Sequence, residues 1–408
     1  MFTYPKYIIT ILLYIGLNST VQAQQTNKSV NDSTENKMNM DAVYDRPFLS
    51  AQKMPVAVGG YLEANVIYAG EEGINEGYSF QARRLTMFMS ASISRRIKFM
   101  SEIEFEEGGK DINIEFAALD ATILPIFNFR GGIIMNPIGA FNENHDGPKW
   151  EFVERPDVAV NMLPATWSNP GFGIFGKTYK RNWIFGYEAY LSNGFDDSII
   201  DNEEDKTFLP ASKQNAARFE ESNNGEPLFT GKIAIKNRNL GEIGLSYMGG
   251  IFNTYEDDDM QLDDKRRLDV FAVDFNTTIR KTGTYLVGEA AWVNVDVPET
   301  YTQQFGNKQF GFFVDVVQPV WRRSFMGWDN ATLNLALRVD HVDWNVGTFD
   351  QTGTNIGDEL WAVTPSISFR PTSQTVFRIN YRQQWKRDIL NNPYERYAAI
   401  MFGFSTYY

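Results

Sequence analysis

From about residue 55 to its end, the chain alternates apolar and polar side chains with a period of two residues. Phe377, Ile379 and Tyr381 share one face of such a segment, and Arg378 and Arg382 share the other. Period two is the pattern of a strand that separates an apolar from a polar environment. About sixteen segments of roughly ten residues show it; they cover residues 55–68, 80–93, 96–106, 112–124, 127–136, 170–177, 182–193, 228–237, 240–251, 267–280, 284–296, 308–320, 330–343, 359–370, 374–385 and 396–408.

The connectors between these segments differ in length at the two ends of the strands. Even-to-odd connectors, such as 94–95 and 371–373, are mostly tight, with 321–329 as an exception. Odd-to-even connectors are mostly long and polar; they cover 70–79, 137–169, 194–227, 252–266, 297–307, 344–358 and 386–395. An even number of strands with short turns at one end and long loops at the other is typical of a closed transmembrane barrel. The sequence therefore predicts a closed antiparallel β-barrel over residues 53–408.

A soluble β-sandwich is the alternative, because its strands also alternate. A sandwich core would have to bury and pair the charged residues that stand in mid-strand, whereas a water-filled lumen tolerates them. The barrel must close, because an open strand edge in lipid leaves backbone groups unsatisfied. These considerations favour the barrel.

The first 52 residues divide into two segments of different character. Residues 1–23 carry Lys6, an apolar stretch of about ten residues and a small residue at Ala23, which is the layout of a cleaved secretory signal peptide. Residues 24–52 are polar and poor in large apolar side chains, so we expect a disordered periplasmic segment. With the barrel, the signal predicts the outer membrane of a Gram-negative cell as the location.

The composition excludes several classes of protein. No run of 18 apolar residues exists, so a bundle of membrane-spanning helices is excluded. The absence of Cys excludes disulfides and cysteine-ligated metals, and a net charge of -13 argues against a nucleic-acid partner. The two histidines, His145 and His341, stand in no metal-ligand spacing, so we expect no cofactor and no metal. An enzyme is not expected either, because a lipase needs a Ser–His pair and the neighbours of His341 favour aromatic packing.

Four short stretches resemble the phosphate-selective porin O/P family. They are Phe80–Leu85, Arg130–Ile133, Asn136–Gly139 and Phe152–Pro156. The resemblance implies a sixteen-stranded barrel, commonly a homotrimer, whose third long loop folds inward and narrows the pore. That loop corresponds to 137–169 here, and the chain has Asn136 where the family often has Lys before the Pro.

The strand faces also assign side chains to the lumen. An arginine stays charged and can bind a carboxylate or phosphate through two hydrogen bonds, so inward arginines are candidates for an anion track. Those that parity turns inward are Arg84, Arg130, Arg338, Arg378 and Arg382. The candidate constriction residues of the third long loop are Lys149, Glu154 and Arg155.

Parity also turns acids inward, and these leave a second interpretation open. They are Glu102, Glu104, Glu115, Glu188, Asp274, Glu289, Asp315 and Asp340. If they pair with the arginines, the lumen has no free basic track. The expected function is then passive diffusion of small hydrophilic solutes or ions through an outer-membrane porin in contact with lipid. Anions such as phosphate are one candidate class of solute; the alternatives are a general or cation-leaning porin without phosphate specificity, and a structural or surface-binding barrel.

Overall fold

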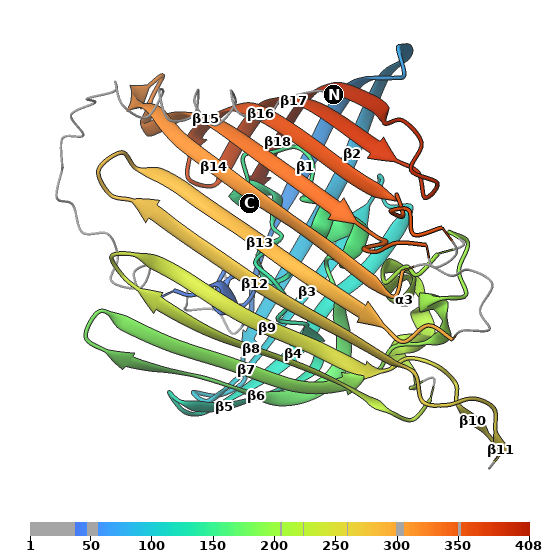
Figure 1. Cartoon of the computed structure of the whole chain (residues 1–408). Coiled ribbons are helices and arrows are strands. Elements are labelled where there is room, and N and C mark those ends of the chain that lie inside the picture. The colour runs from blue at the N-terminus through green and yellow to red at the C-terminus, as the bar shows by residue number, and fades with distance from the viewer. Residues whose placement is uncertain are drawn as a thin grey trace.

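The computed structural model describes residues 37–46, 56–204, 206–222, 224–258, 260–298, 306–349 and 352–408. Sixteen antiparallel strands form one closed barrel, in which β1 pairs with β18 (Figure 1). The predicted fold class is confirmed. The predicted signal peptide over 1–23 lies outside the described residues. None of the helices in the described part of the chain has the length and apolar character needed to cross a membrane.

The elements follow one another around the barrel with few interruptions. The barrel strands are β1 (Val56–Glu71), β2 (Ile74–Ser92), β3 (Ile97–Glu106), β4 (Asp111–Leu124), β5 (Phe127–Met135), β6 (Ser168–Lys180), β7 (Trp183–Asn193), β8 (Pro227–Asn237), β9 (Gly241–Ile251), β12 (Arg267–Ile279), β13 (Thr284–Val295), β14 (Lys308–Phe325), β15 (Trp328–Asp343), β16 (Glu359–Thr372), β17 (Thr375–Arg387) and β18 (Glu395–Tyr407). Outside the barrel sheet lie the hairpin β10 (Glu256–Asp257) and β11 (Met260–Gln261) and the short helices η1 (Asn39–Asp41), η2 (Asn142–Asn144), η3 (Gly147–Lys149), η4 (Val158–Met162), η5 (Asp197–Ile199), α3 (Pro210–Gln214) and η6 (Ala216–Phe219).

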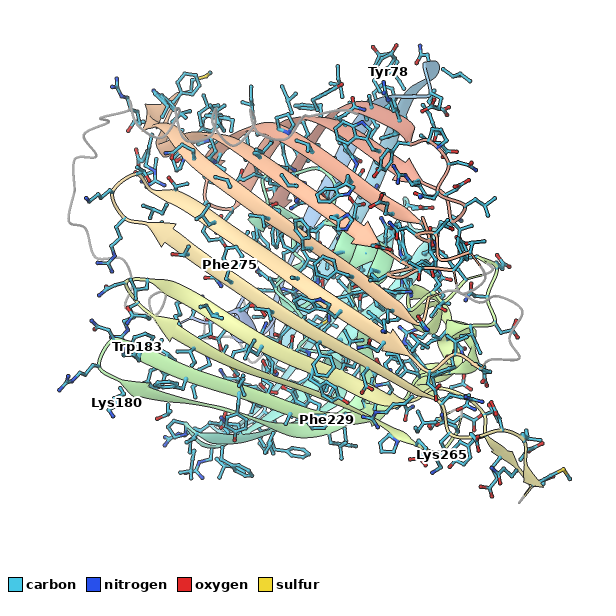
Figure 2. All side chains as sticks on the ribbon, viewed as in Figure 1. Tyr78, Lys180, Trp183, Phe229, Lys265 and Phe275 are labelled. Atoms are coloured by element: carbon cyan, nitrogen blue, oxygen red, sulfur yellow. The ribbon has the colours of Figure 1, made fainter. Side chains whose placement is uncertain are left out.

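Two predicted connectors are shorter than expected. The first long connector, 70–79, is a two-residue turn at Glu72–Gly73, and the supposed exception at 321–329 is a two-residue turn at Met326–Gly327. All four turn residues have positive φ, which fits the right-handed twist of a hairpin. The predictions were wrong because these strands continue beyond their alternating stretch. The other connectors keep the predicted difference in length between the two ends of the barrel. Lys180 lies beside a tight turn at one end, and Lys265 lies in a long loop at the other (Figure 2).

The two faces of the wall differ as the alternation predicts. The outward side chains include many exposed large apolar residues, such as Ile233, Ile243, Ile367, Ile379 and Ile400. All eight acids that parity turned inward are at most 3% exposed. An apolar exterior and a charged, enclosed interior suit a wall between lipid and a polar lumen.

Two long loops enter the lumen instead of extending away from the barrel. Residues 136–167, here called the inward loop, and residues 194–226 supply side chains to the largest buried apolar cluster. Trp150 of the inward loop and Phe195 of the second loop belong to this cluster, together with Phe313 of the wall. The cluster joins β8 to β16 and fills that side of the barrel.

The N-terminal segment also departs from expectation. Residues 37–46 lie inside the barrel against β2 to β9, and Met38, Met40, Val43 and Arg46 are all buried. The prediction of a disordered periplasmic segment over 24–52 is therefore wrong for this part. The remaining residues of that range lie outside the described residues.

Candidate functional site in the barrel lumen

One buried arginine holds the middle of the inward loop against the wall. Arg378 of β17 donates to the carbonyl oxygens of Gly147 at 3.1 Å, Trp150 at 3.1 Å and Phe152 at 2.6 Å. Its other terminal nitrogen lies 2.6 Å from Glu63 of β1. Arg378 is 1% exposed, so these contacts occupy the end of its guanidinium.

Two further arginines hold the loop on either side of that contact. Arg338 binds Asp315 through two hydrogen bonds of 2.7 Å and donates to the Glu154 carbonyl at 2.8 Å. Arg382 lies 2.6 Å from Asp157 of the loop. Both arginines are therefore paired with buried carboxylates, which is the second interpretation that the sequence left open.

The first turn of the inward loop docks on the opposite wall. The Glu289 carboxylate accepts hydrogen bonds from the backbone N–H groups of Ala140 at 2.6 Å and Phe141 at 3.1 Å. Lys232 donates to the Gly139 carbonyl at 2.6 Å and pairs with Asp274 at 2.8 Å. The loop therefore crosses the lumen with a fixed contact at each side.

A cavity of about 490 Å³ lies between the inward loop and the wall. It is on the long-loop side, and its lining is Arg83, Arg84, Glu106, Glu154, Arg155, Asp157, Val160, Asn161, Ala165, Lys213, Arg382, Gln384, Tyr397 and Met401. We call it the outer cavity. Five of these side chains are cationic and three are carboxylates. Arg155 lies 3.7 Å from Glu104, and no described residue hydrogen-bonds its Nη2.

The predicted site residues separate into two groups. Arg84 and Arg382 line the outer cavity, as do Glu154 and Arg155 of the predicted constriction. Arg338, Arg378, Arg130 and Lys149 are not among its lining residues. Arg130 binds Asp120 at 2.7 and 2.9 Å, and Lys149 donates to the Ala42 carbonyl at 3.2 Å.

Sequence reasoning missed two cations of the outer cavity. A register shift in the pairing of β1 with β2, between Glu63/Arg84 and Asn65/Gln81, marks a bulge that lets Arg83 lie on the same side as Arg84. A strict period of two that turns Arg84 inward turns its neighbour Arg83 outward. Lys213 comes from the second loop, in which no periodic pattern gave a signal.

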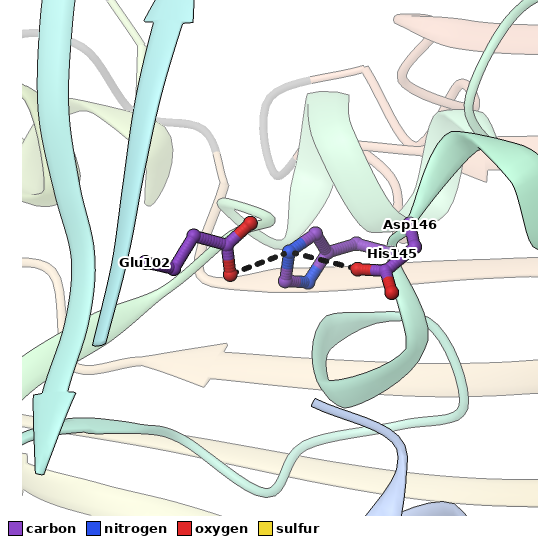
Figure 3. A group of neighbouring side chains, drawn as sticks. All are labelled: Glu102, His145 and Asp146. Atoms are coloured by element: carbon purple, nitrogen blue, oxygen red, sulfur yellow. Dashed lines mark ion pairs between the residues drawn. The ribbon is translucent and has the colours of Figure 1, made fainter. Parts of the chain in front are cut away.

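Glu102 of β3 forms a buried cluster with His145 and Asp146 of the inward loop (Figure 3). The Nε2 of His145 is 3.5 Å from Glu102 and 3.8 Å from Asp146. Imidazole and carboxylates together can bind a divalent metal ion, but the guanidinium of Arg46 lies 2.7 Å from both acids. The sequence does not indicate this cluster, because Glu102 is distant in the chain from His145 and Asp146.

Charge pairing fixes the ionised state of Asp146. Burial alone would raise the pKa of this carboxyl, but the positive charges of Arg46 and Lys149 outweigh burial and hold its pKa well below the ordinary range. Asp146 therefore stays ionised at neutral pH and remains an acceptor for Arg46 and for the hydroxyl of Tyr407, which donates at 2.6 Å.

The pKa of Glu143, which also belongs to the inward loop, is shifted in the direction opposite to that of Asp146. Burial and the neighbouring Glu188 carboxylate raise its pKa well above the ordinary value. As pH rises through the unfolded-state pKa, the unfolded chain loses this proton while the folded chain keeps it, so stability falls.

We expect Glu143→Gln to remove this pH dependence and to stabilise the barrel at neutral pH by roughly 1–3 kcal/mol, measured by unfolding in detergent at several pH values. Glu203→Gln, at an exposed loop position, is the control and should change nothing; an unchanged pH dependence in Glu143→Gln would contradict the assignment.

The barrel and its lumen can be compared with known proteins. No protein-family model matches the chain. An uncharacterized protein of Aquifex aeolicus (strain VF5) is 34% identical over 214 residues, which are 49% of this chain and 46% of that protein. The alignment thus spans less than half of this relative's length.

Solved structures resemble the chain over most of its length. The anion-selective porin of Comamonas acidovorans aligns with a TM-score of 0.53 and 12% identity, over 86% of this chain and 99% of that porin. OmpF of Salmonella typhi, solved in complex with daunomycin, aligns with a TM-score of 0.53 and 12% identity, over 86% and 97% of the two chains. The fold is therefore the porin-type barrel.

Proposed function

We propose that the protein is an outer-membrane channel through which small hydrophilic solutes diffuse passively. The observation that supports this most is a closed barrel whose charged lumen the inward loop narrows while leaving the outer cavity beside it. A sixteen-stranded barrel is wide enough to hold an aqueous path. The apolar exterior suits outer-membrane lipid. The proposal also includes cleavage of a signal peptide over residues 1–23 and assembly of the barrel into a homotrimer.

We propose further that the channel prefers anions. Each carboxylate of the outer cavity has its own arginine: Arg382 pairs with Asp157 at 2.6 Å, Arg83 with Glu154 at 3.3 Å and Arg84 with Glu106 at 3.0 Å. Arg155 and Lys213 have no partner among these three carboxylates; they lie 3.7 Å from Glu104 and 3.9 Å from Glu115, two buried acids outside the cavity lining, so they are the cations of the cavity that are held least closely. Phosphate and carboxylate groups are the anions that an arginine binds most specifically.

The test is the reversal potential of purified protein in a planar bilayer that separates two KCl concentrations. We expect an anion-selective current, and we expect Arg155→Ala to lower the anion-to-cation permeability ratio by about fivefold, since a unit charge at about 4 Å in water is worth about 1 kcal/mol. Addition of phosphate should reduce the chloride current in the wild type more than in the variant.

Arg95→Ala is the matched control, because Arg95 is an exposed arginine at the tight turn between β2 and β3. It should leave the ratio unchanged. A cation preference in the wild type, or an equal ratio for Arg155→Ala and the wild type, would contradict anion preference and favour a general porin. Absence of current in every variant, including one that lacks residues 37–46, would favour a structural or surface-binding barrel.

A further inference from the structure

Residues 37–46 lie on the turn side of the inward loop, opposite the outer cavity. Their contacts run from the turn-end residues of β6 to β9 across the lumen to the inward loop. At the first end Lys177 pairs with Asp41, and Glu242 accepts from the backbone N–H of Asn39 at 3.1 Å. At the other end Arg46 reaches Asp146. The segment therefore lies across the lumen beneath the loop.

The first half of the segment has an apolar binding site in an otherwise charged wall. Met38 and Met40 pack with Ile184 and Ala234, and both methionines are at most 5% exposed. Gly186 of β7 makes room for them, since a Cβ there would lie 2.7 Å from the Met40 sulfur and 3.1 Å from the Met38 sulfur. The wall is thus shaped to accept these side chains.

The second half is held by charge and by aromatic rings. The Arg46 guanidinium lies 2.7 Å from Glu102, donates to both oxygens of Asp146 at 2.7 and 3.1 Å, and lies 3.8 Å from the ring centre of Phe88. Tyr44 covers Arg130, with 3.4 Å between the ring centre and the guanidinium carbon. Burying this cation beside two acids is favourable only while all three groups are together.

The segment is nevertheless not part of the barrel sheet. Among the described residues, its backbone-to-backbone hydrogen bonds join only residues within 38–45. Each of its hydrogen bonds to the wall and the inward loop involves at least one side chain, as when Lys149 donates to the Ala42 carbonyl. It can therefore leave the lumen without breaking a strand pair.

From this geometry we propose that residues 37–46 are a displaceable plug that closes the channel on the turn side of the inward loop. The plug is held by Arg46 in the Glu102–Asp146 site and by the two methionines in the Gly186 recess. The proposal rests on the channel function proposed above. It adds an inhibited state in which the outer cavity is accessible from the loop side while passage through the barrel is blocked.

The first test compares single-channel records of the full chain with those of Arg46→Gln. Loss of this cation leaves Glu102 and Asp146 buried without their partner, which disfavours the plugged state, and we expect the open fraction to rise on the order of tenfold. Lys37→Gln is the matched control, because it removes one positive charge from the same segment at a half-exposed position. It should conduct like the wild type.

The second test uses the absence of cysteine in the chain. In the variant with Met40→Cys and Gly186→Cys, oxidation should join plug to wall and hold conductance at the closed level, and reduction should restore opening. Deletion of 37–46 should give a permanently open channel. Equal conductance in the wild type, Arg46→Gln and the deletion variant would overturn the plug but leave the channel function standing. No conductance in any of them, including the deletion variant, would overturn the channel function, and the plug with it.

Discussion

Replacing Arg378 with alanine is expected to release the middle of the inward loop and to destabilise the barrel by about 3–5 kcal/mol, the usual effect of removing one partner from a buried ion pair. The change leaves three loop carbonyls without their donor and Glu63 without its closest cation. A released loop also widens the path, so single-channel conductance should rise and become noisier. Unfolding in detergent and planar-bilayer recording measure the two effects.

Arg387→Ala is the control for this prediction. Arg387 ends the same strand and lies 3.6 Å from Glu359, away from the inward loop. It should change stability by less than about 1 kcal/mol, as expected for a partly exposed ion pair. If Arg378→Ala unfolds and conducts like this control, the loop does not depend on Arg378.

Gly139→Val is expected to displace the first turn of the inward loop from the opposite wall. Gly139 has a φ of +66°, and a Cβ would lie 2.3 Å from the Glu289 carboxylate. The valine both strains the backbone and pushes away the carboxylate that accepts the Ala140 and Phe141 N–H groups. We expect a loss of several kcal/mol and a larger, less selective conductance.

Gly353→Val separates backbone strain from displacement. Gly353 has a nearly equal φ of +65°, and nothing lies within 4 Å of its added Cβ. This control should cost only the strain of a left-handed residue, about 1–3 kcal/mol, and leave conductance unchanged. Equal conductance for both glycine variants would mean that the contact with Glu289 does not position the loop.

The strands could be predicted from the sequence because period two is a local signal. The eighth strand was expected at 228–237 and lies at Pro227–Asn237. The signal failed at residues 74–79, which precede the alternating stretch of β2, and at residues 321–325, which follow that of β14. These strands are extended by hydrogen bonds to a neighbouring strand, and the sequence of one segment alone does not reveal that pairing.

The lumen was less accessible to sequence reasoning. Parity turned Arg378 inward correctly, but its partners Gly147, Trp150 and Phe152 belong to a loop without periodicity. The same limit applies to Arg46 and Asp146, which are 100 residues apart in the chain. When the partners of a polar segment are this distant in the chain, its sequence resembles that of a solvated segment. The sequence therefore did not predict the plug.

The contact of Arg378 with both Glu63 and the inward loop has a consequence for how the barrel assembles. Glu63 belongs to β1 and Arg378 to β17, so their ion pair reaches across β18 and spans the place where the sheet closes. On the same side, Tyr407 of β18 donates to Asp146 of the loop. The loop thus braces the closing seam from inside, so a variant that loses these contacts loosens the constriction and the closure of the barrel together.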